Sequence, residues 1–230
     1  SVPTAEDDEM ARARLAVATR AALVAGVHTE EIVRHGKQAV KEVVAAATTA
    51  DTNIVIIGRR PPRGDLKQRL LGDIAAQIID QAHCHVLIAG WQSQMWRQRI
   101  LVASDGSMDS DRVAEIAGQI AKVTHIPLTL VATVATGRDR ENAADDLALK
   151  AARIRVEGIE CDSLIVEGAP EQAIPAAARE LGADLVVIGY QQSLGRGMAD
   201  QIIGRLDCAV LVVRSGAEAP QIDSAVAKQA

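Results

Sequence analysis

Several glycines stand at positions where the backbone could close around a phosphate group. Gly58 ends the apolar run NIVIIG and Gly189 ends the similar run DLVVIG, while Gly195 and Gly197 flank one arginine just before a helical pattern. Glycine allows successive backbone N–H groups to point toward one anion, and the N-terminus of a helix adds a favourable field. Gly195 and Gly197 could therefore form a small anion site, although a tight turn gives the same spacing.

His83 and His85 flank Cys84, a pattern that could ligate a metal from one face of a strand. A structural metal site needs about four ligands, and the similar stretch around Cys208 reads Asp-Cys-Ala without either histidine. We therefore predict no metal site. Cys84 and Cys208 are interpreted as small buried hydrophobes, because a redox role needs exposure and a lowered pKa.

Recognisable catalytic motifs are absent from the sequence. The stretch around Gly195 and Gly197 does not continue into the dinucleotide-binding pattern, and no Walker-type phosphate loop occurs. Ser104 and Ser107 lack the elbow and oxyanion signatures of a serine hydrolase. We predict no catalytic residue and at most slow ATP hydrolysis, since any other enzymatic activity would rest on fold analogy alone.

The elements that must position these residues occur twice in the chain. It reads QIIDQAHCHVLIAG at 77–90 and QIIGRLDCAVLVVR at 201–214, with Gln, two Ile and Cys at identical spacing 124 residues apart. Upstream, residues 30–51 and 162–184 both place a short strand, a glycine and an Ala-rich helix in the same order. Shared order over such a length indicates two copies of one domain.

Helical patterns precede these segments in both copies. EMARARLAVATRAALVAG and ENAADDLALKAARIRVEG carry apolar residues at helical spacing and end at Gly26 and Gly158. A helix C-terminus commonly needs a residue in the left-handed conformation, which we predict for both glycines.

The second copy has an opening unit that the first copy lacks. Residues 99–135 are typical of a strand, a capped helix and a strand, whereas residue 1 falls where the equivalent unit would have ended. Short branched-aliphatic strands that alternate with helices predict parallel sheets covered on both faces. We expect two tandem doubly wound, Rossmann-like α/β domains, the first lacking its opening β-α-β, with ligands at the carboxyl ends of the strands.

The expected boundaries are 1–90 for the truncated domain, 91–98 for a linker, 99–215 for the complete domain and 216–230 for a flexible tail. The missing β-α-β would expose sheet edges in the first domain. Truncation of the sequence would explain the gap, as would strands supplied by an upstream domain or by another chain.

The residues of the second copy carry a family resemblance. ILVASDGSMDSDRVAEIAGQIAK resembles the opening strand, Asp-Gly-Ser turn and first helix of the universal stress protein family, and ADLVVIG with the ending CAVLVV resembles its fourth and fifth strands. In the first copy, DLKQRLLGDIAAQIIDQAHCHVLIA is similar to the stretch after the family's phosphate loop. The resemblance implies a tandem universal stress protein with adenine-nucleotide alpha-hydrolase-like domains and a role in stress response or regulation.

The resemblance also implies a glycine pattern for nucleotide binding, from which the first copy departs. Members that bind ATP carry Gly, two residues, Gly, nine residues, and then Gly followed by Ser or Thr. Here Gly58 is present, but Pro61 replaces the second glycine, ten residues separate it from Gly72, and Asp73 stands where a hydroxyl is expected. Proline removes an N–H donor, and a carboxylate at a helix start repels phosphate. Basic residues in this loop could attract an anion, although a solvated basic loop is the commoner arrangement; they are Arg59, Arg60, Arg63 and Lys67.

The second copy departs from the pattern in a different way. Gln192 stands where the second glycine belongs, and the stretch from Gly189 to the cysteine is seven residues shorter than in the first copy. Asp105 remains at the end of the first strand, where the family's ATP binders place an acidic residue near the nucleoside; without a ligand it would cap the turn into the next helix. ATP is thus the candidate cofactor. The candidate cofactor-binding residues are Asp105, Gly189, Gly195, Gly197, Gly58 and Gly72.

Composition excludes several classes of function. The net charge is −5 with scattered Lys and Arg, which argues against a nucleic-acid partner. The longest apolar runs are about six residues, against roughly 20 for a membrane span, and no signal peptide opens the sequence. Three cysteines without a disulfide-framework spacing suit a reducing compartment. We expect a cytoplasmic location without direct membrane insertion of this segment.

Both tryptophans, Trp91 and Trp96, lie in the linker WQSQMW, where they either clamp the two repeats together or lie on the surface. In the family that the sequence resembles, last strands commonly pair across two domains or two chains, so self-association as a dimer or binding of protein partners is expected. The favoured function is a non-enzymatic regulatory module with degenerate nucleotide loops. The alternatives are an ATP-binding switch through the second domain and the cytosolic regulatory tail of a membrane transporter.

Overall fold

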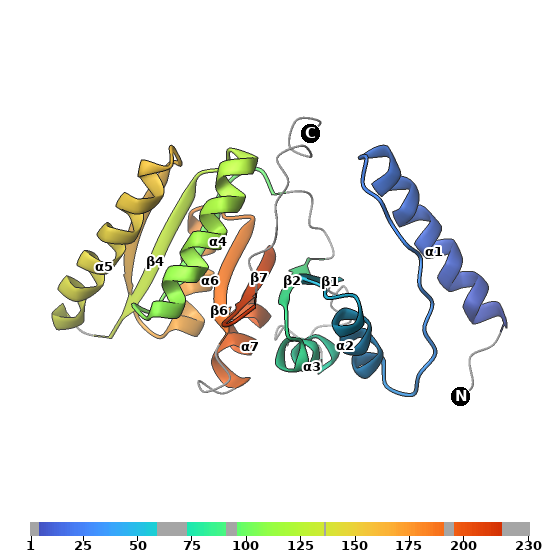
Figure 1. Ribbon diagram of the computed structural model, residues 1–230. Helices are drawn as coiled ribbons and strands as arrows, with labels where there is room; N and C mark the ends of the chain where they lie inside the picture. Colours follow the sequence, from blue (N-terminus) through green and yellow to red (C-terminus); the bar gives the residue numbers. More distant parts are fainter. Residues whose placement is uncertain (1–4, 59–72, 91–95, 136, 191–195, 218–230) are drawn as a thin grey trace.

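The computed structural model describes residues 5–58, 73–90, 96–135, 137–190 and 196–217. Helices and strands alternate along both repeats (Figure 1). The helices are α1 (Ala5–Val24), α2 (Ala39–Thr49), α3 (Asp73–Gln81), α4 (Met108–Thr124), α5 (Gly137–Val156), α6 (Pro170–Glu180) and α7 (Arg196–Arg205). The strands are β1 (Ile54–Gly58), β2 (His85–Ala89), β3 (Ile100–Ser104), β4 (Leu128–Val134), β5 (Cys161–Glu167), β6 (Leu185–Tyr190) and β7 (Ala209–Arg214).

The strands of both repeats join into one seven-stranded sheet of order β1-β2-β7-β6-β3-β4-β5. Neighbouring strands are parallel within each repeat, as the α/β assignment predicts. The junction between the repeats is antiparallel, with Leu87 of β2 opposite Leu211 of β7. The pairing of last strands therefore occurs within the chain. It places a neighbour on both sides of β2 and of β7, so neither offers a free edge to a second chain.

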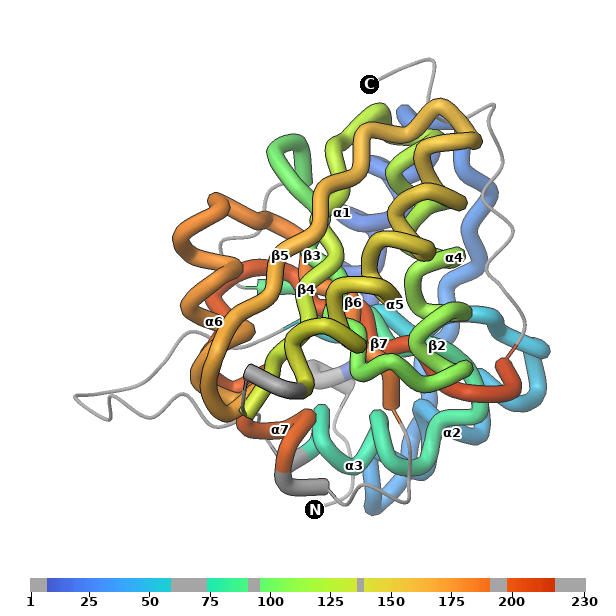
Figure 2. Tube along the Cα trace, turned by 90° about the vertical axis from the view of Figure 1, so that its left-hand side faces the viewer, coloured from blue at the N-terminus to red at the C-terminus, as the bar shows by residue number. Residues whose placement is uncertain are grey.

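Helices cover both faces of the sheet (Figures 1 and 2). The sheet therefore lies between two layers of buried apolar residues. Residues of α4 and α5 pack on one face, where Ile116 and Leu147 are almost fully buried. Residues of α2, α3, α6 and α7 pack on the other face, around Ile79 and Ile203. Because α3 and α7 are the equivalent helices of the two repeats, the second layer runs continuously across the β2–β7 junction.

The prediction of a short strand within residues 30–51 is wrong, because residues 27–36 form no strand. Its counterpart in the second repeat, β5, pairs along its whole length with β4. The sequence contains no counterpart of β4 in the first repeat. Without that partner, the backbone of this stretch has no ladder to join.

Helix α1 shows the same effect of a missing neighbour. In the second repeat its counterpart α5 packs on the sheet, and Leu147 is only 1% exposed. In α1, by contrast, Val17 and Leu23 are each 72% exposed. Figure 1 shows this helix lying apart from the sheet, beyond β1, with an extended connection leading to α2.

The predicted helix ends are confirmed. Gly26 and Gly158 follow α1 and α5 with φ angles of +72° and +81°, which glycine adopts without the steric cost of a Cβ atom. None of the helices in the described part of the chain combines the length and apolarity needed to cross a lipid bilayer.

Because β2 lies inside the sheet and β1 at its edge, we expect replacement of isoleucine by alanine to destabilise the protein more in β2 than in β1. Ile88 of β2 is 1% exposed, whereas Ile56 of the edge strand β1 is 63% exposed. We expect Ile88→Ala to lower the free energy of unfolding by about 2–5 kcal/mol. Ile56→Ala should cost less than about 1 kcal/mol. Urea unfolding followed by circular dichroism measures both, and equal costs would contradict the buried position of β2.

Candidate functional site

A cavity of about 130 Å³ lies at the carboxyl ends of β3, β4 and β6. The chain runs from β3 to β4 and β5 on one side and returns to β6 and β7 on the other. The cavity thus lies at the topological switch point, where doubly wound sheets bind their ligands. Its volume is below the roughly 300–1,000 Å³ of typical ligand pockets, so it suits part of a nucleotide better than a whole one.

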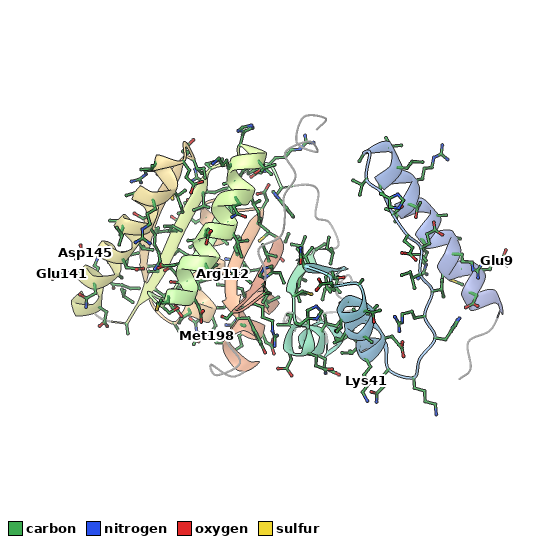
Figure 3. The ribbon with its side chains drawn as sticks, in the orientation of Figure 1. Glu9, Lys41, Arg112, Glu141, Asp145 and Met198 are labelled. Atoms are coloured by element: carbon green, nitrogen blue, oxygen red, sulfur yellow. The ribbon has the colours of Figure 1, made fainter. Side chains whose placement is uncertain are left out.

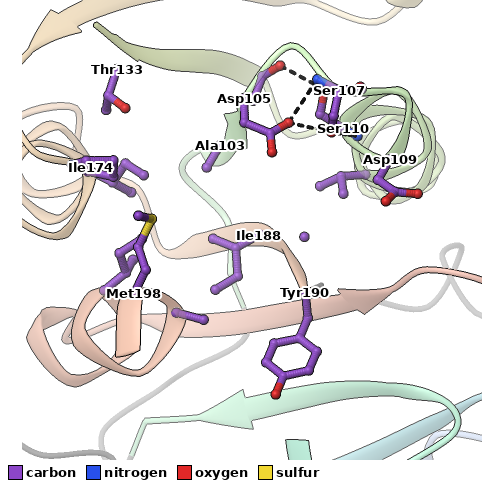
Figure 4. Close-up of a pocket in the computed structure, with 16 residues that line it drawn as sticks. Ala103, Asp105, Ser107, Asp109, Ser110, Thr133, Ile174, Ile188, Tyr190 and Met198 are labelled. Atoms are coloured by element: carbon purple, nitrogen blue, oxygen red, sulfur yellow. Dashed lines mark hydrogen bonds between the residues drawn. The ribbon is translucent and has the colours of Figure 1, made fainter. Parts of the chain in front are cut away.

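Asp105 lies at the rim of the cavity, directly after β3 (Figure 4). Its Oδ1 accepts hydrogen bonds from the backbone N of Ser107 at 3.0 Å and from the Ser107 hydroxyl at 2.6 Å. Gly106 between them has a φ of +76°, which permits this tight turn. The two bonds fix the carboxylate through one oxygen and leave Oδ2 outside the turn.

Ser107 is also the N-cap residue of α4, so one side chain joins the rim of the cavity to the start of a helix. Its extended backbone conformation precedes the helix, and its Oγ accepts a hydrogen bond from the backbone N of Ser110 at 3.3 Å. The Ser110 hydroxyl in turn donates to the Ser107 carbonyl at 2.6 Å. The capped helix predicted within residues 99–135 is therefore α4, and its cap is Ser107.

A polar network continues from the cavity floor into the space between α4 and α5. The buried Ser104 hydroxyl lies 3.2 Å from Ser110 Oγ and 3.3 Å from Asp146 Oδ2. Asp146 accepts from Lys150 Nζ at 2.6 Å, and Lys150 also pairs with Asp111 at 3.1 Å. Lys150 is only 4% exposed. A buried lysine is tolerated here because two carboxylates compensate its charge.

The opposite wall of the cavity is apolar. It is formed by Ile174 of α6, Ile188 of β6 and Met198 of α7, which Figure 4 places across the cavity from Asp105. Gly189 continues this wall, and a Cβ atom there would lie 3.2 Å from the Val113 side chain. The cavity thus combines a carboxylate edge with an apolar wall, an arrangement that suits a ligand with an apolar face and hydroxyl or amine donors.

Tyr190 lines the cavity and also reaches the first repeat. Its hydroxyl donates to Asp80 Oδ1 of α3 at 3.2 Å, and the Arg214 guanidinium lies 5.7 Å from its ring centroid. Burial raises the pKa of Tyr190, and the hydrogen bond to Asp80 and the charge of Asp80 raise it further. Arg214 acts in the opposite direction on this pKa.

The structure brings together only some of the predicted site residues. Asp105 and Gly189 line the cavity, and Gly197 lies in the first turn of α7 beside the lining residue Met198. Gly58 ends β1 in the first repeat and is not part of this cavity. Gly72 and Gly195, together with the basic loop of the first repeat, lie outside the described residues.

Sequence analysis missed three contributors to the site. Lys150 and Asp146 form an i,i+4 pair on α5, which is a readable signal for an ion pair but not for burial. Tyr190 is the single tyrosine and directly follows Gly189, yet nothing in the sequence indicates its contact with Asp80.

The histidines and cysteines lie away from the cavity. His83 precedes β2, and its Nδ1 lies 3.4 Å from Thr48 Oγ1 of α2, whereas the fully buried His85 accepts from the backbone N of Arg214 at 3.1 Å. Within the described ranges, no three His, Cys, Asp or Glu residues are grouped closely enough to hold a metal ion. Cys84 is buried as predicted, and burial raises its pKa, while Cys208 is half-buried.

Of the two tryptophans in the linker, the structure describes Trp96. Trp96 is half-buried against the α4–α5 side of the core, with its indole nitrogen buried, whereas Trp91 lies outside the described residues. That core layer includes Leu87 of the first repeat as well as residues of the second. A clamp by both tryptophans stays a prediction.

Comparison with known proteins connects this arrangement to a family. The model of the Universal stress protein family matches residues 1–90 and 97–214. A universal stress protein from Archaeoglobus fulgidus DSM 4304 superposes with a TM-score of 0.74 at 25% identity, covering 91% of this chain and 77% of that one. A putative universal stress protein from Pseudomonas aeruginosa UCBPP-PA14 has a TM-score of 0.70 at 18% identity, covering 88% and 78%, which shows the shared fold.

A universal stress protein from Archaeoglobus fulgidus in complex with dAMP is 25% identical, covers 50% of this chain and 97% of that one, and has a TM-score of 0.46. No curated protein matches the chain.

The dual role of Ser107 predicts a stability cost for its removal. Ser107→Ala deletes the N-cap of α4 and one of the two bonds to Asp105, so we expect the free energy of unfolding to fall by about 1 kcal/mol. Ser163→Ala, at an exposed position on β5, is the matched control and should change it by less than about 0.5 kcal/mol. Equal values in chemical unfolding would show that the cap contributes nothing.

Because Tyr190 is the only tyrosine, tyrosinate absorbance during an alkaline titration reports this residue alone. We expect its midpoint to lie above the ordinary value of about 10 and to fall in Asp80→Asn, which removes the neighbouring negative charge. The unfolded chain loses this proton first, so the contribution of Tyr190 to stability is complete below that ordinary value and declines as the pH rises above it. A wild-type midpoint at the ordinary value would contradict the buried contact with Asp80.

Proposed function

The chain belongs to the universal stress protein family, and we propose that it is a non-catalytic regulatory module of the stress response. In this proposal the second domain binds the nucleoside part of an adenine nucleotide in the cavity around Asp105. We propose an adenine nucleotide because the ATP-binding members of the family place an acidic residue near the nucleoside. The cytoplasm is the proposed location, consistent with three free cysteines.

The position and fixation of Asp105 carry the proposal. A carboxylate at the end of the first strand of a doubly wound sheet can accept hydrogen bonds from ribose hydroxyls. Here Oδ1 is already held by Ser107, so the carboxylate is preorganised and Oδ2 remains for a ligand. The apolar wall around Ile188 and Met198 offers a surface on which a base could lie.

The charges of the side chains around the cavity argue against tight binding of phosphate groups. Among the described residues that line the cavity, none is Lys, Arg or His, whereas Asp105 and Asp109 are both acidic. Acidic side chains near the start of α4 occupy the favourable field of the helix N-terminus and repel additional negative charge. The departures of both glycine loops from the family pattern act in the same direction. We therefore expect little gain in affinity from the β- and γ-phosphates.

The described groups around the cavity also favour binding over catalysis. The Ser107 hydroxyl donates to Asp105 and the Ser110 hydroxyl donates to the Ser107 carbonyl, and the described lining of the cavity includes no histidine or lysine that could act as a base. Away from the cavity, at the start of β5, Cys161 is buried, and that burial raises its pKa to about 11, which suits a packing role rather than a nucleophile.

Thermal unfolding with adenosine, AMP and ATP tests the proposal. A ligand at 100 times its Kd should stabilise the folded chain by about 2.7 kcal/mol, which raises the Tm by several degrees. We expect the three ligands to bind with similar affinity. Asp105→Asn should weaken each by about tenfold or more, because it removes a charged hydrogen-bond acceptor.

Asp145→Asn is the matched control, since this exposed aspartate on α5 does not line the cavity and lies far from the lining residue Met198 in Figure 3. It should leave all three affinities unchanged. A much larger effect of ATP than of adenosine would indicate an ATP-controlled switch with a working phosphate site. Absence of binding by any of the three would overturn the proposal.

A further inference from the structure

The carboxyl end of β6 connects the cavity with the first repeat. Tyr190 is the last residue of β6 and lies opposite Arg214, the last residue of β7, in the parallel ladder. Tyr190 is both a wall of the cavity and the donor of a hydrogen bond to Asp80 on α3. In Figure 4 its ring extends away from Asp105, out of the second domain's site.

Arg214 fixes the end of α3 through the backbone. Its Nη1 donates to the carbonyl of Ile79 at 2.8 Å and to that of Asp80 at 3.3 Å, both in the last turn of α3. A cation at a helix C-terminus is favourable because the final carbonyls have no partner within the helix. The backbone N of Arg214 donates to the fully buried ring of His85 on β2. Arg214 thus contacts both elements of the first repeat that border the junction.

The residues of this contact differ between the repeats. Alignment of the two copies places Tyr190 opposite Arg59, Asp80 opposite Gly204 and Arg214 opposite Gly90. The surrounding positions are shared, as in the two Ile residues that precede both Asp80 and Gly204. The contact is therefore a property of the interface between the repeats and not of the domain fold that both repeats share.

We propose that Tyr190, Asp80 and Arg214 form a latch that couples occupancy of the second domain's cavity to the packing of the first repeat. This inference rests on the proposed function, whose ligand would contact the cavity side of Tyr190. A ligand that binds better when the ring is latched stabilises α3 and β2, and by linkage an intact latch strengthens ligand binding by the same factor. Tyr190 acts as a positioning residue through which the two repeats communicate.

The latch can be opened with small changes that preserve the shape of the side chains. Tyr190→Phe removes only the hydroxyl, and Asp80→Asn removes the charge of its acceptor; Asp145→Asn again serves as the control. Hydrogen exchange of backbone amides is measured in the full chain without ligand. We expect Asp80→Asn, a change in the first repeat, to speed exchange of cavity residues in β6 and α7 by about fivefold or more.

The same amides are then followed with AMP as the probe. In the wild type, AMP should slow exchange at the start of α4, next to Asp105, and also in α3 and β2. In Tyr190→Phe and Asp80→Asn, protection should persist at α4 but disappear from α3 and β2. A general loss of stability would lower protection everywhere, so the selective loss separates coupling from mere destabilisation.

Two results would overturn the latch. One is unchanged exchange of the cavity amides in ligand-free Asp80→Asn, and the other is undiminished AMP protection of α3 and β2 in both variants. If AMP protects no cavity residue in the wild type, the proposed ligand is wrong, and the ligand-free comparison still decides the latch.

Discussion

The antiparallel ladder between β2 and β7 is the contact on which the rest of the structure depends. The described part of the first repeat contributes only β1 and β2 to the sheet, and two strands alone are marginally stable in water. Pairing with β7 makes them an extension of a five-stranded sheet that has its own core. The buried pairs Val86–Val212 and Leu87–Leu211 therefore organise the first repeat as well as joining it to the second.

The set of strands in each repeat also explains why the cavity lies in the second repeat. The cavity needs the ends of β3, β4 and β6, and the first repeat has a counterpart of β6 alone among these. Consequently Gly58, the counterpart of Gly189, ends a strand with no Asp105 equivalent beside it. The exposed apolar residues of α1 and β1 have the same origin, because the elements that would cover them are not in this sequence. The two repeats thus differ in their cavity and in their exposed apolar surface because they contain different sets of strands.

Much of the fold could be predicted from the repeated phrase and the alternation of strands and helices, because these patterns are local. Asp105 and Gly189 could also be predicted, since Asp105 directly follows a recognisable strand and Gly189 ends a recognisable apolar run. The strand expected between residues 30 and 36 failed because local propensity does not supply a pairing partner. The burial of Lys150 could not be predicted, because charged residues on a helix are usually solvated. Only packing against α4 buries it beside Asp111 and Asp146.

The sequence by itself determined the family, the α/β class, the duplication and the acidic residue at the end of the first strand of the second copy. The α/β class follows from local periodicity and the duplication from phrases repeated 124 residues apart, whereas the family and the meaning of the acidic residue follow from the resemblance of short motifs. Tertiary structure alone decided that the two sheets become one, that Tyr190 meets Asp80 across the junction, and that Ser104 leads from the cavity floor to a buried lysine. These contacts join residues that lie between 42 positions apart, as in Ser104 and Asp146, and 126 positions apart, as in Val86 and Val212. Such proximity arises only when strands pair and helices pack, so no local pattern encodes it.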